Sequence, residues 1–477
     1  MGQLHIILVP MIAHGHMIPL LDMAKLFSSR GVQTTIIATP AFADPVRKAR
    51  EAGHDIGLTI TSFPPEGSSL PDNILSLDQV TNDMIAEFFR ALELLQQPVE
   101  EIMKELKPDC LVSDMFLPWT TDSAAKFGIP RLIFHGTCCF SRCCAIEMGL
   151  QKPFKNVSSD SEPFVIPNLP HELSFVRTQV PDFELQEDVN ENPFTKMMKQ
   201  MRESEARSYG DVINSFQELE SEYADHYKNI LGMKAWHIGP LLLCNKRGEE
   251  KASQRGKKSV IDEDECLAWL NSKKPNSVVY MCFGSMATFT PAQLHETAVG
   301  LESSGQDFIW VVRNAGENED WLPQGFEERI KGRGLMIRGW APQVMILNHP
   351  SVGAFVTHCG WNSTLEGICA GLPMVTWPVS AEQFYNEKLV TEVLKTGVSV
   401  GNKKWHKVGD GVGSEAVKAA VVQVMVGDGA AEMRSRAKHY KEMAGKAIEE
   451  GGSSYNALNA LIEELSAYVP PMKLAIN

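Results

Sequence analysis

The sequence predicts an α/β protein made of two doubly wound domains, each with a parallel sheet between layers of helices. The chain has 477 residues, of which 44% are hydrophobic, and it is longer than one hydrophobic core usually organises. Short apolar runs typical of parallel core strands stand near the start of each half, at Leu4–Val9 and Val278–Phe283. Helical segments and further apolar runs alternate after both, which is the pattern of repeated strand–helix–strand units.

In the first half, predicted strands alternate with predicted helices. We expect strands at Leu4–Val9, Val32–Thr39, Leu58–Phe63, Asp109–Ser113 and Pro130–Phe134. We expect helices at Met17–Ser29, at Gln79–Leu106 with a break at Pro98, at Trp119–Phe127 and at Phe194–Ser208. Residues 151–189 carry five prolines. Because a long irregular stretch inside a compact domain usually has a function, we expect it to form part of a binding wall.

The second half repeats this alternation after a charged segment. We expect strands at Val278–Phe283, Asp307–Arg313, Leu335–Arg338, Gly353–Thr357 and Pro373–Trp377, and helices at Glu415–Val426, Gly429–Glu450 and Ser454–Tyr468. Thr290 and Pro291 predict the N-cap and first residue of another helix. The predicted boundaries are an N-terminal domain at 1–242, a linker at 243–262, a C-terminal domain at 263–455 and a terminal segment at 456–477.

Composition and charge exclude several functions. A net charge of −14 argues against nucleic-acid binding as the main activity. No apolar run reaches the roughly 18 residues that span a bilayer, so we expect no stable membrane insertion. The first residues lack the basic region and cleavage site of a signal peptide, and the ten cysteines fit a reducing compartment. We therefore expect a cytoplasmic protein, and a monomer.

Two groups of residues invite a metal-binding interpretation. Cys138-Cys139 and Cys143-Cys144 are adjacent pairs, but they lack zinc-ligand spacing and have no further Cys or His pair nearby in the sequence. Buried small hydrophobic residues are the better interpretation. His14 and His16 stand close together, but no third ligand is apparent. We expect no bound metal.

The stretch 340–383 is the most informative part of the chain. Its middle predicts a buried strand, then the loop 358–362, then a helix with Ser363 at the N-cap and Glu366 three residues later. The unpaired N–H groups and the dipole of such a helix start favour an anion, so we expect a phosphate-bearing ligand here. Taken alone, Ser363 and Glu366 are also consistent with a capping box that binds no ligand.

The whole stretch, WAPQVMILNHPSVGAFVTHCGWNSTLEGICAGLPMVTWPVSAEQ, resembles the signature box of plant UDP-sugar-dependent glycosyltransferases that act on small secondary metabolites. The likeness extends over essentially the whole chain through GHMIPLLDMAKLFSSRG, SDMFLPWTTDSAAKFGIPR, WHIGPL, CFGS and SAEQFYNEKLVTEVLK, and is closest to the phenylpropanoid group of that family. It implies the GT-B architecture, in which two Rossmann-like domains face each other across a cleft. It also implies that the segment 456–477 crosses back onto the first domain.

The resemblance further implies a site for UDP-glucose as co-substrate, with no cofactor and no metal. The residues implied near the base and ribose are Trp340, which would stack on uracil, Ala341, Gln343 and Glu366, which would bind ribose hydroxyls. Those implied near the diphosphate are Ser285, His358, Asn362 and Ser363. Those implied near the sugar are Thr137, Trp377, Glu382 and Gln383. The resemblance also implies that Trp361 binds the UDP-sugar. The family more often has Asp where this chain has Glu382, whereas Gln383 is its usual glucose-associated residue.

His16 and Asp114 form the predicted catalytic pair. His16 stands where the first strand passes into the first helix, and Asp114 ends another strand, so both belong at the carboxyl edge of a parallel sheet, where ligands bind. Because a helix N-terminus disfavours imidazolium, we expect a neutral His16 that can take a proton. Asp114 would accept from the other ring N–H and stabilise the charge that forms. The resembled family likewise places its general base and the partner of that base at these positions.

Together these features predict an inverting glycosyltransferase that moves glucose from UDP-glucose to a hydroxyl of a small plant metabolite, giving a β-O-glucoside. The acceptor would be a phenolic, coumarin, flavonoid or triterpenoid. The alternative is a non-catalytic sugar-nucleotide or metabolite-binding protein of the same fold, which would not need the pair of His16 and Asp114. A nicotinamide-dependent oxidoreductase would need a G-x-G-x-x-G turn, and the first turn, Ala13–His16, has one glycine. A UDP-sugar epimerase or hydrolase would have little use for an acceptor wall.

Overall fold

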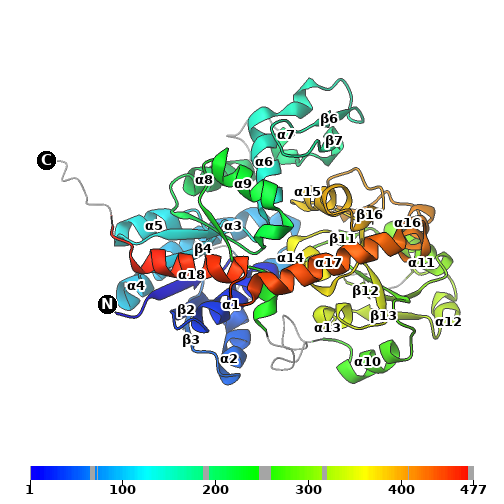
Figure 1. Ribbon diagram of the computed structural model, residues 1–477, viewed down its shortest axis with the longest axis horizontal. Coiled ribbons are helices and arrows are strands. Elements are labelled where there is room, and N and C mark those ends of the chain that lie inside the picture. Colours follow the sequence, from blue (N-terminus) through cyan, green and yellow to red (C-terminus); the bar gives the residue numbers. More distant parts are fainter. Residues whose placement is uncertain are drawn as a thin grey trace.

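Two parallel sheets organise the chain, as Figure 1 shows for the computed structural model. The structure describes residues 2–64, 70–71, 74–185, 193–245, 259–313, 320–406 and 408–470. The first sheet has seven strands in the order β3-β2-β1-β4-β5-β8-β9, and the second has six in the order β13-β12-β10-β14-β15-β16. All of their pairings are parallel, so the predicted α/β class with two doubly wound sheets is confirmed.

The first domain consists of the seven-stranded sheet and its helices. Its strands are β1 (His5–Val9), β2 (Gln33–Ala38), β3 (Ile56–Ile60), β4 (Cys110–Asp114), β5 (Arg131–Phe134), β8 (Gly210–Ile213) and β9 (Ala235–His237). Its helices are α1 (His14–Ser28), α2 (Ala43–Glu51), α3 (Ile85–Leu94), α4 (Gln96–Leu106), α5 (Thr120–Phe127), α6 (Cys139–Gln151), α7 (Asp182–Leu185), α8 (Pro193–Glu205) and α9 (Ser221–Asn229). Strands such as β1 and β4 are buried along their whole length, which explains their continuous apolar sequences.

The second domain repeats the plan around the six-stranded sheet. Its strands are β10 (Val278–Cys282), β12 (Asp307–Val312), β13 (Gly334–Arg338), β14 (Val352–Thr357), β15 (Met374–Thr376) and β16 (Gly397–Ser399). Its helices are α10 (Glu263–Asn271), α11 (Pro291–Ser303), α12 (Phe326–Ile330), α13 (Gln343–Leu347), α14 (Trp361–Ala370), α15 (Gln383–Lys388), α16 (Ser414–Val426) and α17 (Ala430–Ile448). As predicted, Thr290 caps α11 and its hydroxyl accepts from Gln293 N at 3.1 Å.

The predicted elements differ from the structure at several points, and some elements, such as α2, α6, α9 and β8, were not predicted. The helical region predicted to break at Pro98 breaks at Leu95 instead, between α3 and α4. Pro98 lies in the first turn of α4, where its missing N–H has no helical partner to lose. The predicted loop region 151–189 contains the hairpin β6 (Pro163–Val165) and β7 (Ser174–Val176). The short edge strands β9 and β16 were not predicted, because three-residue strands give little periodic signal. A further pair, β11 (Thr288–Phe289) and β17 (Val408–Gly409), is equally short.

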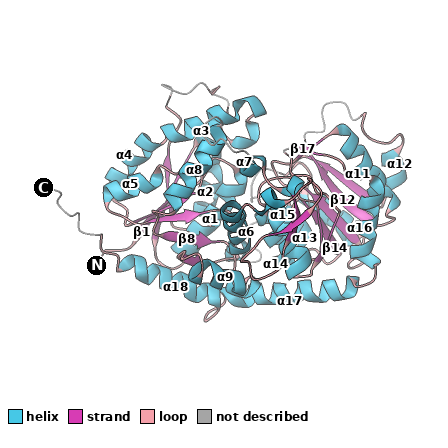
Figure 2. Cartoon of the chain, turned by 90° about the horizontal axis from the view of Figure 1, so that it is seen from above, coloured by secondary structure: helices cyan, strands magenta, loops and turns pink. Residues whose placement is uncertain are grey.

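The predicted linker, 243–262, lies largely outside the described residues. The chain ends with α18 (Ser453–Ser466), which follows α17 and packs on the first domain. Figure 2 shows α17 and α18 in line along one side of both domains. Leu458, Leu461 and Leu465 of α18 are buried among the first-domain core residues, and the Ser454 hydroxyl donates to Gly239 O at 2.5 Å. The helix therefore joins the two domains through apolar packing.

Apolar packing is also continuous across the interface between the sheets. One buried cluster contains Phe140 and Tyr223 of the first domain together with Phe355 and Leu365 of the second. The cysteines that invited a metal interpretation, Cys138, Cys139, Cys143 and Cys144, are all buried in this cluster, as their interpretation as small hydrophobic residues requires. None of the described helices combines the length and apolar character needed to cross a membrane.

Replacing Leu461 tests whether α18 is part of the first-domain core. Leu461 is completely buried, so Leu461→Ala is expected to lower the free energy of unfolding by about 2–5 kcal/mol. Val469 is 79% exposed, and Val469→Ala is the control that should change it very little. Denaturant unfolding of both variants measures the difference. Equal stability of the two variants would show that α18 does not contribute to the core.

Candidate active site

A cavity of about 510 Å³ lies between the two domains. Its wall includes the segments that follow β1, β4 and β5 of the first sheet and β10, β12, β13 and β14 of the second. This is the carboxyl edge of both parallel sheets, where ligands bind in such folds. The sequence-predicted residues that line it are His16, Thr137, Ser285, Trp340, Ala341, Gln343, His358, Trp361, Asn362, Ser363, Glu366, Glu382 and Gln383. Asp114 and Trp377 do not line it.

His16 lies at the cavity wall in the first turn of α1, with Asp114 behind it. The Nδ1 atom of His16 is 2.6 Å from Asp114 Oδ2. Asp114 is fully buried, and its other carboxylate oxygen accepts from Phe116 N at 3.0 Å, which fixes the group. Because a carboxylate only accepts hydrogen bonds, Nδ1 is the protonated ring nitrogen. Nε2 is then the nitrogen that can take a proton from a bound molecule.

The surroundings of His16 act on its pKa in two opposite directions. Burial acts to lower the pKa of His16, but the charge and hydrogen bond of Asp114 outweigh it, with a further contribution from the charge of Glu382. The net effect raises the pKa of His16 above its ordinary value. A carboxylate in direct contact with the ring therefore favours its protonated form.

The N-terminus of α14 differs from its prediction. The helix begins at Trp361 with Gly360 at the N-cap, so the predicted N-cap at Ser363 and its capping box are wrong. Cys359 adopts a left-handed conformation with φ +66°, which turns the chain sharply after β14 and starts the helix earlier. Trp361 N donates to the Glu382 carboxylate at 3.3 Å, so that side chain, from another loop, contacts the helix start. Ser363 consequently lies inside the first turn.

Gln343 organises one end of the cavity. Its side-chain nitrogen donates to Ser363 Oγ at 3.1 Å and to Glu366 Oε2 at 2.7 Å. Its side-chain oxygen accepts from the Tyr280 hydroxyl at 3.2 Å. These contacts define the orientation of the amide and fix the Glu366 carboxylate beside it, and Trp340 lines the same cavity. The same end of the cavity thus presents an indole, an amide and a carboxylate, which suit a heteroaromatic base and a sugar diol.

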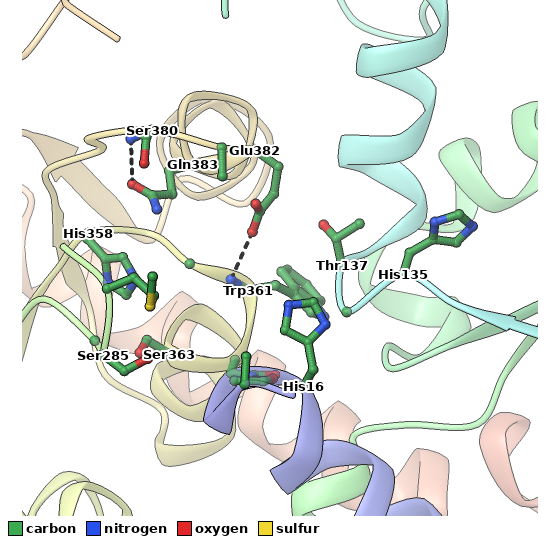
Figure 3. A pocket seen from close by; sticks show the side chains of 18 of the residues that line it. His16, His135, Thr137, Ser285, His358, Trp361, Ser363, Ser380, Glu382 and Gln383 are labelled. Carbon is green, nitrogen blue, oxygen red and sulfur yellow. Dashed lines mark hydrogen bonds between the residues drawn. The ribbon is translucent and has the colours of Figure 1, made fainter. Parts of the chain in front are cut away.

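His358 is held between two glycines. A Cβ atom at Gly284 would come within 2.5 Å of the ring Cε1, and one at Gly360 within 2.5 Å of Nε2. Burial, together with the charge of Arg313, lowers the pKa of His358 to about 4, so the ring is neutral at neutral pH. Its buried Nδ1 has no hydrogen-bond partner in the described part of the chain. Ser285 lies beside it in Figure 3.

The other end of the cavity contains Glu382, Gln383 and Thr137, with Trp361 at its centre in Figure 3. The Gln383 side-chain oxygen accepts from Val379 N at 2.8 Å and from Ser380 N at 2.9 Å. Its NH₂ group therefore remains as the part that can contact a ligand. The buried hydroxyl of Thr137 has no partner among the described residues. Burial also raises the pKa of the Glu382 carboxyl, against the opposing effect of its hydrogen bonds and of His16.

Trp377 does not reach the cavity, contrary to its predicted position near the sugar. Trp377 directly follows β15, and its backbone N–H donates to Thr357 O at 2.9 Å. Its side chain is fully buried in the second-domain core, with ring centroids 5.3 Å from Phe283 and 5.7 Å from Phe289. A large apolar ring at this strand end contributes more by packing than by facing a polar ligand.

The apolar part of the cavity comes from the first domain. Side chains from the ranges 80–95, 140–150 and 180–205 contribute to it. The contributing side chains include Phe89, Ala145, Phe183 and Met198. Figure 3 shows Thr137 and His135 on this side.

Sequence reasoning missed three basic residues in the wall, His135, Arg142 and Arg313. His135 Nε2 is 3.2 Å from Asp211 Oδ1, and Arg142 donates to Glu205 Oε2 at 2.7 Å. His135 and Arg313 each follow a buried strand directly, which is the signal that identified Asp114 and could have found them. Arg142 lies on α6 and gives no such signal.

Cys139 has neighbours in space that the sequence did not indicate. Its Sγ atom, a carboxylate oxygen of Glu220 and a ring nitrogen of His237 all lie within 4.8 Å of one another, and all three residues are buried. Glu220 Oε2 accepts from Phe140 N at 2.7 Å, so this carboxylate caps the start of α6. Burial raises the pKa of the Cys139 thiol well above its ordinary value, which keeps it protonated. The helix cap explains the position of Glu220 in this group.

The fold and cavity define a class of protein. Among solved structures, the chain is similar to UGT73P12 of Glycyrrhiza uralensis complexed with glycyrrhetinic acid 3-O-monoglucuronide, with a TM-score of 0.91, 40% identity and coverage of 98% of this chain and 96% of that one. It is also similar to UGT71G1 of Medicago truncatula complexed with UDP-glucose, with a TM-score of 0.79, 27% identity and coverage of 98% and 99%. The protein therefore has the GT-B architecture of glycosyltransferases.

The chain matches the family model described as UDP-glucoronosyl and UDP-glucosyl transferase over residues 6–426. It is 58% identical to scopoletin glucosyltransferase of Nicotiana tabacum, over 98% of this chain and 99% of that one. It is 53% identical to anthocyanin 3'-O-beta-glucosyltransferase of Gentiana triflora, with the same coverage. The protein thus belongs to the UDP-glycosyltransferase family of plant secondary metabolism and is a UDP-glycosyltransferase. The alternative of a non-catalytic binding protein is therefore wrong.

The close approach of Gly284 to His358 can be tested against a matched glycine. Gly284 and Gly305 have φ values of +70° and +71°, but a Cβ at Gly305 would meet no atom within 4 Å. Alanine at either position adds backbone strain of about 1–2 kcal/mol. Gly284→Ala should lower the free energy of unfolding by about 1–3 kcal/mol more than Gly305→Ala does, because its new methyl group also crowds the imidazole of His358. Denaturant unfolding compares them, and equal losses would mean that His358 moves aside without cost.

Proposed function

We propose that the protein transfers glucose from UDP-glucose to a phenolic hydroxyl of a coumarin or flavonoid, with inversion at the anomeric carbon to give a β-O-glucoside. The observation that carries this proposal is the contact of 2.6 Å between His16 and Asp114, at the point where the apolar first-domain wall meets the second-domain end of the cavity. Relatives whose names include scopoletin and an anthocyanin support this acceptor class. A triterpenoid acceptor is supported more weakly, through the ligand of the Glycyrrhiza structure. The monomeric state stays a prediction.

The reaction would need one displacement. His16 Nε2 takes the proton of the acceptor hydroxyl, and Asp114 stabilises the resulting imidazolium through Nδ1. The acceptor oxygen forms a bond to the anomeric carbon while the bond from that carbon to the phosphate oxygen breaks. UDP leaves with the electron pair of that bond. The N-terminus of α14 and the neutral His358 N–H would stabilise the charge that grows on its phosphate.

In the proposed complex, the UDP-glucose molecule extends along the length of the cavity. The uracil would stack on Trp340 near Ala341 and Gln343, with the ribose hydroxyls on Glu366. The diphosphate would lie between the start of α14 and the segment carrying Ser285. The residues proposed to contact the diphosphate there are Ser285, His358, Asn362 and Ser363. The glucose would then lie beside Trp361, within reach of Thr137, Glu382 and Gln383, and its anomeric carbon would face His16.

Removing the proposed base should stop transfer without weakening UDP binding. His16→Ala is expected to lower the rate about 10²–10⁴-fold, since general-base catalysis typically contributes that much. The affinity for UDP should stay unchanged, because the base contacts the acceptor. Turnover with UDP-glucose and a panel of coumarins and flavonoids, read by product mass, and calorimetry with UDP measure the two effects. Normal turnover would contradict the proposal.

The same pair predicts the pH dependence. His16 must be unprotonated to act, and its pKa is raised, so kcat/KM should increase with pH through a midpoint above the ordinary value near 6.5. Asp114→Asn removes the charge that raises this pKa. Its midpoint should therefore move to lower pH while its maximal rate falls. Asp122→Asn, which changes an exposed carboxylate, is the control. An unmoved midpoint in Asp114→Asn would contradict the role of this pair.

The proposed contact of Gln383 with glucose can be separated from its contact with the backbone. Gln383→Ala should cost about 1–3 kcal/mol in transfer from UDP-glucose, while UDP, which lacks the sugar, should bind as before. Gln383→Glu keeps an oxygen for Val379 N and Ser380 N but loses the NH₂ group. It should show a similar loss. If Gln383→Glu instead behaves like the parent, the residue only holds the loop, and equal damage to UDP binding would place it at the nucleotide.

A further inference from the structure

The electrostatics of the cavity raise a question about how an anionic donor is held. The chain has a net charge of −14, and the wall of the cavity contains the carboxylates of Glu366 and Glu382. His358 adds no positive charge, since its ring is neutral at neutral pH. The dipole of α14 would have to bind a diphosphate against two carboxylates. A cation in this region would offset them.

Arg313 is placed to supply that charge. It follows β12 directly, at the carboxyl edge of the second sheet, and it lines the cavity. Of the described residues that line the cavity, Arg142 is the other arginine, and it belongs to the first domain, where Glu205 pairs with it at 2.7 Å. No ion pair joins Arg313 to a carboxylate within the described ranges. Its charge is therefore available to a ligand.

Two contacts hold Arg313 beside the residues proposed to bind the donor. Its guanidinium carbon lies 4.4 Å from the centre of the Trp340 ring, a cation–π distance. Its Nε donates to Gly339 O at 3.3 Å, the carbonyl directly before Trp340. Its charge also contributes to the low pKa of His358, so its field reaches the residue proposed to contact the phosphates. The guanidinium thus stands between the base end and the phosphate region.

We propose that Arg313 is a further donor-binding residue, which supplies the positive charge that attracts the diphosphate of the UDP-sugar and stacks on the indole of Trp340. This inference rests on the proposed function, because it takes UDP-glucose as the donor. A planar guanidinium can stack and attract phosphate at once, whereas a neutral residue could only stack and a lysine could only provide charge. The two contributions can therefore be separated by substitution.

Calorimetry with uridine and with UDP tests the proposal. Arg313→Gln keeps a planar polar group without charge, and should weaken UDP on the order of tenfold while weakening uridine, which has no phosphate, less than about threefold. Arg313→Lys keeps the charge, and should weaken UDP less than Arg313→Gln does. Raising the salt concentration should reduce the preference for UDP over uridine in the parent more than in Arg313→Gln. Arg338→Gln removes a charge outside the cavity and is the matched control.

Different binding results would overturn the role of Arg313 alone or the proposed function as well. Equal weakening of uridine and UDP would show that Arg313 acts only through Trp340, and unchanged binding of UDP by Arg313→Gln would show that it does not act at all. Either result overturns the inference and leaves the proposed function standing. A parent protein that binds no UDP would overturn the proposed function and this inference together. Thermal unfolding of each variant identifies misfolding, and in that case Arg313→Lys alone decides whether the charge is needed.

Discussion

The site depends on the contact between the first turns of α1 and α14, which belong to different domains. Asn362 of α14 donates through its side-chain nitrogen to Gly15 O of α1 at 2.5 Å. Trp361 Nε1 donates to Asn214 O of the first domain at 2.8 Å. These bonds bring the helix start suited to an anion next to the helix start that carries His16. Without this contact, each domain would hold only half of the arrangement proposed for transfer.

Burial influences the pKa values of the two histidines near this contact, His16 and His358. Asp114 is fully buried beside His16, so its charge is poorly screened and raises the pKa of that imidazole. His358 is partly buried and has no carboxylate contact within the described part of the chain, and burial together with the charge of Arg313 lowers its pKa to about 4. Two histidines near one cavity thus have opposite shifts for identifiable reasons. The first is suited to take and hold a proton, and the second to remain a neutral hydrogen-bond donor.

Sequence patterns predicted most of the fold and much of the site, and the errors have physical causes. The long buried strands and the helix capped by Thr290 gave clear periodic or capping signals. The start of α14 was placed too late because Ser363 and Glu366 have capping-box spacing, although the left-handed Cys359 decides where the helix begins. Trp377 was placed near the sugar by resemblance, but its strand position directs it into the core.

The sequence by itself determined the α/β class, the family and the carboxyl-edge position of His16 and Asp114, because strand periodicity and motif spacing are local properties of the chain. The tertiary structure decided which of those residues meet. The approach of Arg313 to Trp340, of Glu382 to the start of α14 and of α18 to the first domain joins segments far apart in the sequence. Such contacts depend on how the two sheets and their helices pack, and pKa values depend on the burial that this packing creates.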